Sequence, residues 1–322
     1  MPIRIPDTLP GRAVLEAERI PLILEGRALR QDIRPMQVAI MNLMPDKIQT
    51  ETQLLRAIGG TPLQVEVTLL HPGSHTSRNT AATHLSAFYK TLPEVAHRRF
   101  DALITTGAPV EHLPYEEVTY WDELRAVMDW ADENVFSSFY ICWGAQAALA
   151  HYYGIPKHVL PHKHSGVYPH RVIDPFEPLT AGFDPVFNVP VSRHTEVRAQ
   201  DVQRVAALEV LAESGDTGLC LVQDASARRV FMFNHLEYDT ETLKREYDRD
   251  AAAGMNPQVP ANYFPGNDPA QPPQITWRAH RNLLFHNWIN MVYQGTPFDL
   301  RDIDGATPGW LPQSAARQKE AA

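Results

Sequence analysis

An apolar run passes directly into small residues in the stretch Val135-Phe136-Ser137-Ser138-Phe139-Tyr140-Ile141-Cys142-Trp143-Gly144-Ala145-Gln146-Ala147-Ala148-Leu149. The apolar run predicts a buried strand, and the small residues that follow predict a helix. Cys142 stands at the junction, the setting that exposes a nucleophile on a tight strand-to-helix turn. Gly144 and Ala145 are small enough for such a turn. The stretch therefore predicts a strand, a sharp turn at Cys142 and a helix.

Cys142 is a candidate nucleophile because the positive end of a helix dipole stabilises the negative charge of a thiolate. The alternative is an inert core cysteine, since free cysteine is among the most buried residue types. Cys220 lies in the strand-like run 218–222 and is expected to be such a core cysteine.

A histidine and an acid follow a second apolar run, in the order Asn234-His235-Leu236-Glu237. In an extended segment residues i and i+2 face the same way, so Glu237 can reach one imidazole nitrogen while the other faces a thiol. A surface histidine beside a solvated acid is the alternative for this pair alone. Asp239 is a rival acid, but it is expected to cap the next helix. Cys142, His235 and Glu237 together indicate covalent acyl chemistry.

Composition narrows the class of protein. The chain has 322 residues, of which 44% are hydrophobic, and a formal net charge of -9. It has only two cysteines, and we find no signal peptide and no apolar run near the ~20 residues of a membrane span. Basic tracts with interleaved aromatics are also missing from the sequence. We therefore expect a reduced, soluble, cytoplasmic enzyme without nucleic-acid or membrane partners.

The first half of the chain alternates strand and helix patterns. Such alternation predicts an α/β fold with a parallel sheet, helices on both faces and chemistry at the carboxyl ends of the strands. Gly107-Ala108-Pro109 follows one of these strands, so it can approach Cys142 and supply N–H groups to an oxyanion, or form a plain turn. Strands are expected at 36–44, 63–70, 100–106 and 136–141, and helices at 46–59, 80–92 and 116–134.

The second half predicts shorter strands in a mixed extension of the sheet. They are expected at 166–173, 187–191, 205–211, 219–222 and 230–233. A helix capped by Asp239 or Thr240 should run to about Ala253, and a last helix should span 277–293. We divide the chain into an N-terminal arm that packs on the body (1–34), a single catalytic domain (35–300) and a largely flexible tail (301–322). The arm is expected to be irregular because it is rich in proline.

The histidines do not suggest a metal site. His162 and His164 flank Lys163, and His170 and His194 follow at a distance. This is not the spacing of a zinc site, which needs clustered Cys or His ligands or a His-Glu-x-x-His helix. We predict no metal.

Several motifs follow one another along nearly the whole chain. They are Met1-Pro2-Ile3-Arg4-Ile5-Pro6, Asn42-Leu43-Met44-Pro45-Asp46-Lys47, Thr106-Gly107-Ala108-Pro109, Ile141-Cys142-Trp143-Gly144-Ala145-Gln146-Ala147, Ser165-Gly166-Val167-Tyr168, Ser192-Arg193-His194-Thr195-Glu196, and Asn262-Tyr263-Phe264-Pro265 to Asn282-Leu283-Leu284-Phe285. With these motifs the chain resembles the homoserine O-acyltransferase family of methionine biosynthesis. This resemblance implies a flavodoxin-like, class I glutamine amidotransferase-like fold in which Cys142 carries the acyl group, His235 is the general base and Glu237 orients it. It also implies L-homoserine and acetyl-CoA as substrates, no cofactor beyond that cosubstrate, and a homodimer.

The resemblance further implies substrate contacts at Lys163, Ser192 and Arg249, and an influence of position 111 on the acyl donor. A guanidinium group such as that of Arg249 suits the carboxylate of homoserine. Glu111 would repel the free carboxylate of a succinyl group by about 4 kcal/mol at ~4 Å and an effective dielectric of ~20. Succinyl-using members tend to have glycine there, so Glu111 favours acetyl-CoA.

The sequence departs from the family motifs at two places, and three other functions remain as alternatives. Relatives commonly have Gly-His-Pro-Glu or Gly-His-Ser-Glu where this chain has Asn234-His235-Leu236-Glu237, and often a histidine where it has Val191. These differences concern the shape of the amino-acid pocket. The alternatives are a homoserine O-succinyltransferase, a glutamine amidotransferase, and a non-catalytic redox-sensing protein that would need Cys142 but not His235, Glu237 or Arg249.

Overall fold

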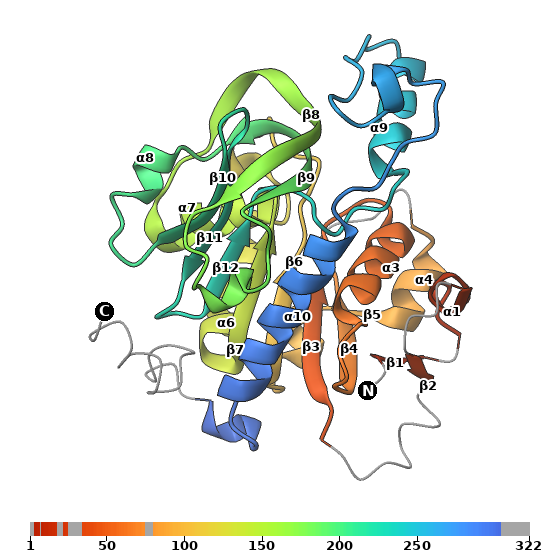
Figure 1. The fold of residues 1–322 in the computed structure, drawn as a ribbon. Helices are drawn as coiled ribbons and strands as arrows, with labels where there is room; N and C mark the ends of the chain where they lie inside the picture. The colour runs from red at the N-terminus through yellow and green to blue at the C-terminus, as the bar shows by residue number, and fades with distance from the viewer. Residues whose placement is uncertain (1–2, 7, 18–21, 25–33, 75–79, 304–322) are drawn as a thin grey trace.

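The computed structural model describes residues 3–6, 8–17, 22–24, 34–74 and 80–303. Its strands form one 12-stranded sheet with the order β2-β1-β4-β3-β6-β7-β12-β11-β10-β8-β9, and β5 pairs with β4 beside this path (Figure 1). The strands are β1 (Ile3–Ile5), β2 (Leu22–Leu24), β3 (Met36–Met41), β4 (Val65–Leu70), β5 (Tyr89–Lys90), β6 (Phe100–Thr105), β7 (Val135–Ile141), β8 (His158–Val172), β9 (Val186–Glu196), β10 (Glu209–Ser214), β11 (Gly218–Asp224) and β12 (Arg229–Met232).

The parallel half of the sheet confirms the α/β fold. β4, β3, β6, β7 and β12 all pair in parallel, and the strands predicted from the apolar runs lie where they were expected. Met232 is in register with Ile141 across β12 and β7. The carboxyl ends of these two strands therefore meet at one edge, which brings the residues after Met232 close to Cys142.

The other half of the sheet is antiparallel, from β12 through β11, β10 and β8 to β9. β8 and β9 are longer than predicted and form a hairpin that rises above the carboxyl edge of the parallel strands (Figure 1). The strand predicted at 205–211 was shifted, since helix α8 (Ala199–Val202) and a turn precede β10.

The N-terminal segment is more regular than predicted. β1, helix α1 (Arg12–Ala17) and β2 occupy part of it, so the prediction of an irregular arm was wrong for the described residues. β1 pairs in parallel with β4 and thereby extends the sheet, which packs this segment on the body. The boundaries 1–34, 35–300 and 301–322 stay predictions, and most of the predicted tail, 304–322, lies outside the described residues.

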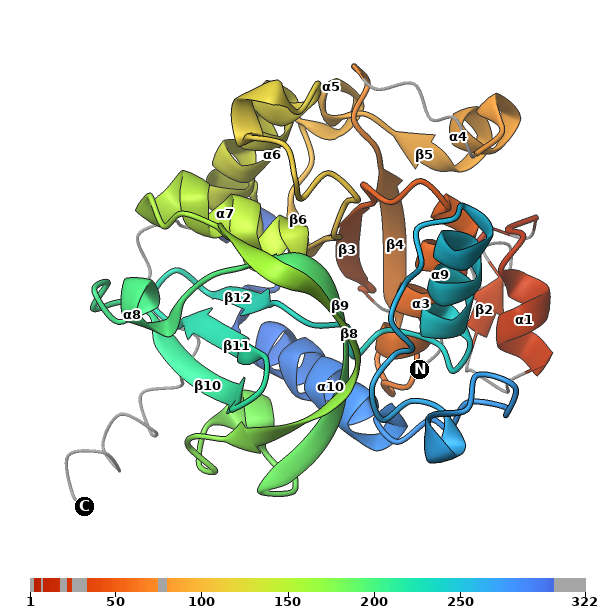
Figure 2. The same ribbon diagram turned by 90° about the horizontal axis from the view of Figure 1, so that it is seen from above.

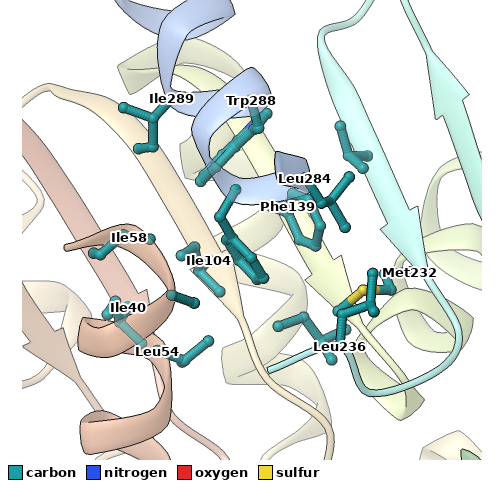
Figure 3. Packing of buried hydrophobic residues seen from close by; sticks show 14 of the residues in the cluster. Ile40, Leu54, Ile58, Ile104, Phe139, Met232, Leu236, Leu284, Trp288 and Ile289 are labelled. Carbon is teal, nitrogen blue, oxygen red and sulfur yellow. The ribbon is translucent and has the colours of Figure 1, made fainter. Parts of the chain in front are cut away.

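Helices cover both faces of the parallel strands (Figure 2). Helices α3 (Lys47–Ile58) and α10 (Arg278–Gly295) lie on one face, and α6 (Trp121–Asn134) and α7 (Trp143–Tyr153) on the other. Apolar side chains of α3 and α10 meet those of the strands and form a continuous core (Figure 3). Among the described residues, no helix has both the length and the apolar character needed to cross a bilayer. The core residues labelled in Figure 3 are Ile40, Leu54, Ile58, Ile104, Phe139, Met232, Leu236, Leu284, Trp288 and Ile289.

Several helix ends differ from the prediction. The helix expected at 80–92 is divided into α4 (Ala82–Phe88) and α5 (Leu92–Val95), because β5 intervenes and a Thr91–Glu94 capping box starts a new helix. The helix expected at 116–134 begins only at Trp121, after a short 3-10 turn. Helix α9 (Thr242–Ala252) starts after Glu241, without a side-chain cap. The prediction that Asp239 caps it was wrong, because the Asp239 carboxylate is paired with Arg56.

We predict that Gly144→Ala disrupts the strand-to-helix turn. A Cβ atom at position 144 would lie 2.5 Å from the Thr106 carbonyl oxygen and 3.1 Å from that of Thr105, both of them backbone atoms that cannot move cheaply. Such overpacking should lower the free energy of unfolding by about 1 to 3 kcal/mol, measured by urea denaturation. Gly215→Ala is the matched control, because a Cβ there meets nothing within 4 Å. Equal unfolding free energies of Gly144→Ala and Gly215→Ala would contradict the predicted steric clash at position 144.

Candidate active site

Cys142 occupies a left-handed turn between β7 and α7. Its backbone has φ 52° and ψ -117°, a conformation that L-residues rarely adopt. The turn is held by hydrogen bonds from the Cys142 amide to Met232 O (2.7 Å) and from the Ala145 amide to Cys142 O (3.0 Å). A Cβ at Gly107 would lie 3.2 Å from Cys142 Cβ and 3.7 Å from its Sγ, so the predicted approach of the 107–109 loop is confirmed. The turn aims the sulfur at the carboxyl edge of the sheet.

His235 connects Cys142 to Glu237. Its Nδ1 lies 2.6 Å from Glu237 Oε1, and its ring also hydrogen-bonds Cys142. Burial opposes protonation of His235, but the negative charges of Glu237 and Cys142 and their hydrogen bonds raise its pKa well above the usual value. The contact between His235 and Glu237 was predicted on the assumption that this segment is extended. Residues 235–238 instead form a turn, in which the Tyr238 amide donates a hydrogen bond to His235 O. The site therefore stabilises the protonated form of His235 beside Cys142.

Tyr238 packs against His235, and no local sequence pattern indicated this contact. Its ring stacks on the imidazole of His235, with centroids 4.1 Å apart and planes at 17°. Its hydroxyl donates to Glu246 Oε1 (2.8 Å). Tyr238 thus fixes the tilt of His235 and ties it to helix α9.

The pocket over Cys142 brings together the predicted site residues. It encloses about 690 Å³ of empty space including its open mouth. His235 lines this pocket and also a smaller neighbouring cavity. Glu237 lines only the smaller cavity. The lining residues are Met44, Gly107, Ala108, Pro109, Glu111, His112, Cys142, Lys163, Ser192, His194, His235, Tyr238, Glu246 and Arg249.

Charged groups from β8 and α9 form one wall of this pocket. Lys163 Nζ lies 3.3 Å from Asp250 Oδ2 and 3.7 Å from Glu246 Oε2. The hydroxyl of Ser192 also donates to Glu246. Arg249 pairs with Asp250 at 2.7 Å and its side chain is 67% exposed, so its guanidinium lies at the rim and not in a closed clamp. Glu246, which the sequence reasoning missed, is thus an anionic centre surrounded by the predicted substrate residues.

Burial alone would raise the pKa of Asp250, but the hydrogen bond from Arg249 and the charge of Lys163 lower it. Its carboxylate is therefore charged at neutral pH, and it fixes both cations at the pocket wall.

Glu111 forms part of the opposite wall. Its Oε2 accepts hydrogen bonds from the His194 amide (2.7 Å), the Thr195 amide (3.2 Å) and the Thr195 hydroxyl (3.2 Å). The Thr195 hydroxyl also lies 2.8 Å from Gln146 Oε1 on helix α7. These contacts hold the Glu111 side chain in place on the same pocket as Cys142.

Two buried cations near the pocket were also missed. Lys47 donates to the carbonyls of Asn42 (2.7 Å) and Met44 (3.3 Å) and so braces the loop that carries Met44 into the pocket. Burial lowers the pKa of Lys47 to about 8, against the opposing effect of Glu51. Arg193 is fully buried and donates to Thr217 O, and although burial lowers its pKa, the charge of Cys142 acts to raise it. Arg193 is thus a buried cation close enough to Cys142 for the two groups to interact electrostatically.

Cys220 has the inert character that was predicted for it. It is buried in β11, and burial raises the pKa of its thiol to about 12 against the effects of Asn234 and Arg193. A thiol of this kind is almost entirely protonated at neutral pH, so it is a poor nucleophile.

The fold is of the class I glutamine amidotransferase-like type. A glutamine amidotransferase from Thermotoga maritima aligns with a TM-score of 0.52 at 10% identity, covering 81% of this chain and 99% of that one. At this identity the likeness concerns the fold alone.

A family model described as homoserine O-succinyltransferase matches residues 2–298, so the chain belongs to that family and is an acyltransferase. A relative named homoserine O-acetyltransferase from Acetivibrio thermocellus is 54% identical over 304 residues, which cover 94% of this chain and 100% of the relative. A relative of the same name from a Chelativorans species is 55% identical over 303 residues, 94% of this chain and 97% of its own. The resemblance inferred from the motifs is confirmed.

We predict a pH-dependent loss of stability in Glu237→Gln. A histidine whose folded-state pKa is raised stabilises the fold fully below its unfolded pKa of ~6.5, and that contribution disappears as pH rises through the folded-state value. Glu237 raises the pKa of His235, so the loss of unfolding free energy in Glu237→Gln should be greatest between about pH 5 and 6.5 and should shrink above. Urea denaturation at several pH values measures it. Glu133→Gln, an exposed change on α6, is the control. If the difference in unfolding free energy between the wild type and Glu237→Gln did not vary with pH, the proposed effect of Glu237 on the pKa of His235 would be contradicted.

Proposed function

We propose that the protein is a homoserine O-acetyltransferase that moves an acetyl group from acetyl-CoA to the hydroxyl of L-homoserine through a thioester on Cys142. The observation that carries the proposal is the hydrogen-bonded chain Cys142–His235–Glu237 at the base of a pocket with fixed charges on its wall. This role would belong to methionine biosynthesis. The homodimer and the cytoplasmic location stay predictions.

The first half-reaction would acylate the enzyme. The Cys142 thiolate attacks the thioester carbonyl, the bond from that carbon to the CoA sulfur breaks, and His235 gives its proton to the leaving sulfur. Amides of the Gly107-Ala108 segment would stabilise the oxyanion. The Gly107 carbonyl accepts from the Thr106 hydroxyl (2.9 Å), which fixes the orientation of that peptide.

The second half-reaction would transfer the acyl group to the acceptor. His235 takes the proton of the homoserine hydroxyl, whose oxygen attacks the acyl carbon and releases the Cys142 thiolate. The amino acid is a zwitterion, so it needs an anionic and a cationic contact. Glu246, held by Ser192 and Tyr238, suits the ammonium group, and Arg249 at the rim suits the carboxylate.

The family membership leaves the acyl donor open, since the family description names a succinyltransferase and the relatives are named acetyltransferases. Glu111 supports the acetyl donor, because its carboxylate is fixed on the pocket that Cys142 lines. A succinyl group would bring a second carboxylate into this pocket. Lys157, which donates to the Glu111 backbone carbonyl (2.6 Å), offsets part of that repulsion.

We predict that Cys142→Ala forms no acetyl-enzyme and transfers no acetyl group. Intact-mass spectrometry after mixing with acetyl-CoA should show an added acetyl group on the wild type and none on this variant. The matched control is Cys220→Ala, which should keep the label because Cys220 is buried away from the pocket and protonated. Acetyl transfer to homoserine by Cys142→Ala would refute the covalent route.

We predict that Glu111→Gly shifts the donor preference toward succinyl-CoA. The ratio of kcat/KM for acetyl-CoA to that for succinyl-CoA should fall by about 10- to 100-fold, equivalent to about 1.4 to 2.8 kcal/mol. Glu111→Gln separates charge from size, because it keeps the side-chain volume and should shift the ratio in the same direction. An unchanged ratio in both variants would contradict the charge argument.

A further inference from the structure

A second cavity adjoins the catalytic pocket. It encloses about 920 Å³ of empty space between β8, β9, α9 and the loop at 255–258. Lys163 and His194 line both the cavity and the pocket, so the two spaces share a wall. Of the residues that line this cavity, only Lys163 has a role predicted from the sequence.

The base of the cavity lies next to the substrate wall of the pocket. Ser165 of β8 lines the cavity, and its cross-strand neighbour Ser192 of β9 lines the pocket. Directly paired residues of an antiparallel pair have neighbouring side chains on one face of the sheet. A chain-like ligand can therefore pass from Ser165 toward Ser192 and Cys142.

The electrostatics of the cavity suit a neutral ligand. Among the described residues that line it, Lys163 is the only lysine or arginine, and Asp250 and Glu246 neutralise it. Burial lowers the pKa of His194, opposed by Glu111, so its ring is neutral at pH 7. A phosphate group would find no free lysine or arginine in this lining, and Asp250 would repel it.

The cavity also offers amide partners and apolar surface. Asn256 and Gln258 contribute carboxamides, and Met255 and Pro257 contribute apolar surface. Asn256 has φ 47° and follows Gly254 at φ 74°, so the loop contains two left-handed residues. A non-glycine residue in this conformation, such as Asn256, occurs more often at ligand sites. The flexible side chain of Met255 can adapt to varied partners.

We infer that this cavity binds the pantetheine arm of the acyl-CoA donor and leaves the 3′-phospho-ADP part outside. The inference rests on the proposed use of an acyl-CoA. The arm is neutral and narrow, it contains two amides, and it must lead away from a thioester that reaches Cys142. Those properties match the polarity of the cavity and its position beside the pocket.

Truncated donors test the inference on the wild type. The donors are acetyl-CoA, S-acetylpantetheine and S-acetyl-N-acetylcysteamine, and kcat/KM is measured with saturating homoserine. Removal of the phospho-ADP part should change kcat/KM by less than about fivefold, whereas removal of the rest of the arm should lower it by about tenfold or more.

Ser165→Phe should fill the cavity and remove the preference for donors that carry the whole pantetheine arm. We expect kcat/KM for acetyl-CoA and S-acetylpantetheine to fall about tenfold or more, while S-acetyl-N-acetylcysteamine and the KM for homoserine change little. Arg171→Phe is the matched control on the same strand, because that side chain is 68% exposed and lies outside the cavity. Asn256→Gly keeps the left-handed backbone and removes one carboxamide, so it provides a milder variant if Ser165→Phe does not fold.

The outcomes separate this inference from the proposed function. If the wild type is acetylated but shows no preference for the longer arm, the inference fails alone. It also fails alone if Ser165→Phe lowers all donors equally or raises the KM for homoserine. If the wild type is acetylated by none of the three donors, the proposed function fails and the inference fails with it.

Discussion

The left-handed backbone at Cys142 sets the direction in which the candidate nucleophile leaves the sheet. It turns the chain from β7 into α7 so sharply that the sulfur projects from the carboxyl edge of the sheet. Gly107 and Gly144 make the turn possible, since a side chain at either position would collide with or crowd its neighbours. The parallel register of β7 and β12 then determines that the segment after Met232 brings His235 to the same edge. Nucleophile and base are thus joined by sheet geometry, although they are far apart in the chain.

The antiparallel half of the sheet and helix α9 contribute polar and charged residues to the pocket around Cys142 and His235. β8 and β9 bring Lys163 and Ser192 to the pocket, and α9 brings Glu246 and Arg249. Their ion pairs and hydrogen bonds hold positive and negative groups side by side. The same parallel core is found in a glutamine amidotransferase. β8, β9 and α9 therefore give this pocket its charged wall, and fold alone does not determine function.

The sequence predicted the parallel half well, because strands buried on both faces read as continuous apolar runs, as β3 and β6 do. β8 was predicted too short because it is only partly buried and carries many polar residues. Asp239 was misassigned because its partner, Arg56, lies 183 residues away. The candidate residues Cys142, His235 and Glu237 follow local motifs, and the structure brings them into contact. Tyr238 and Glu246 were missed, since their roles arise from packing between distant elements and leave no local pattern.

We infer that His235, whose ring is hydrogen-bonded to Cys142, makes this sulfur reactive, whereas the protonated Cys220 thiol stays inert. The most direct measurement is the rate of alkylation by iodoacetamide at pH 7, with each cysteine followed by peptide mass spectrometry. We expect the wild type to be labelled at Cys142 and not at Cys220, and His235→Ala to slow the labelling of Cys142 by about tenfold or more. Equal rates in the two proteins, or preferential labelling of Cys220, would contradict this inference.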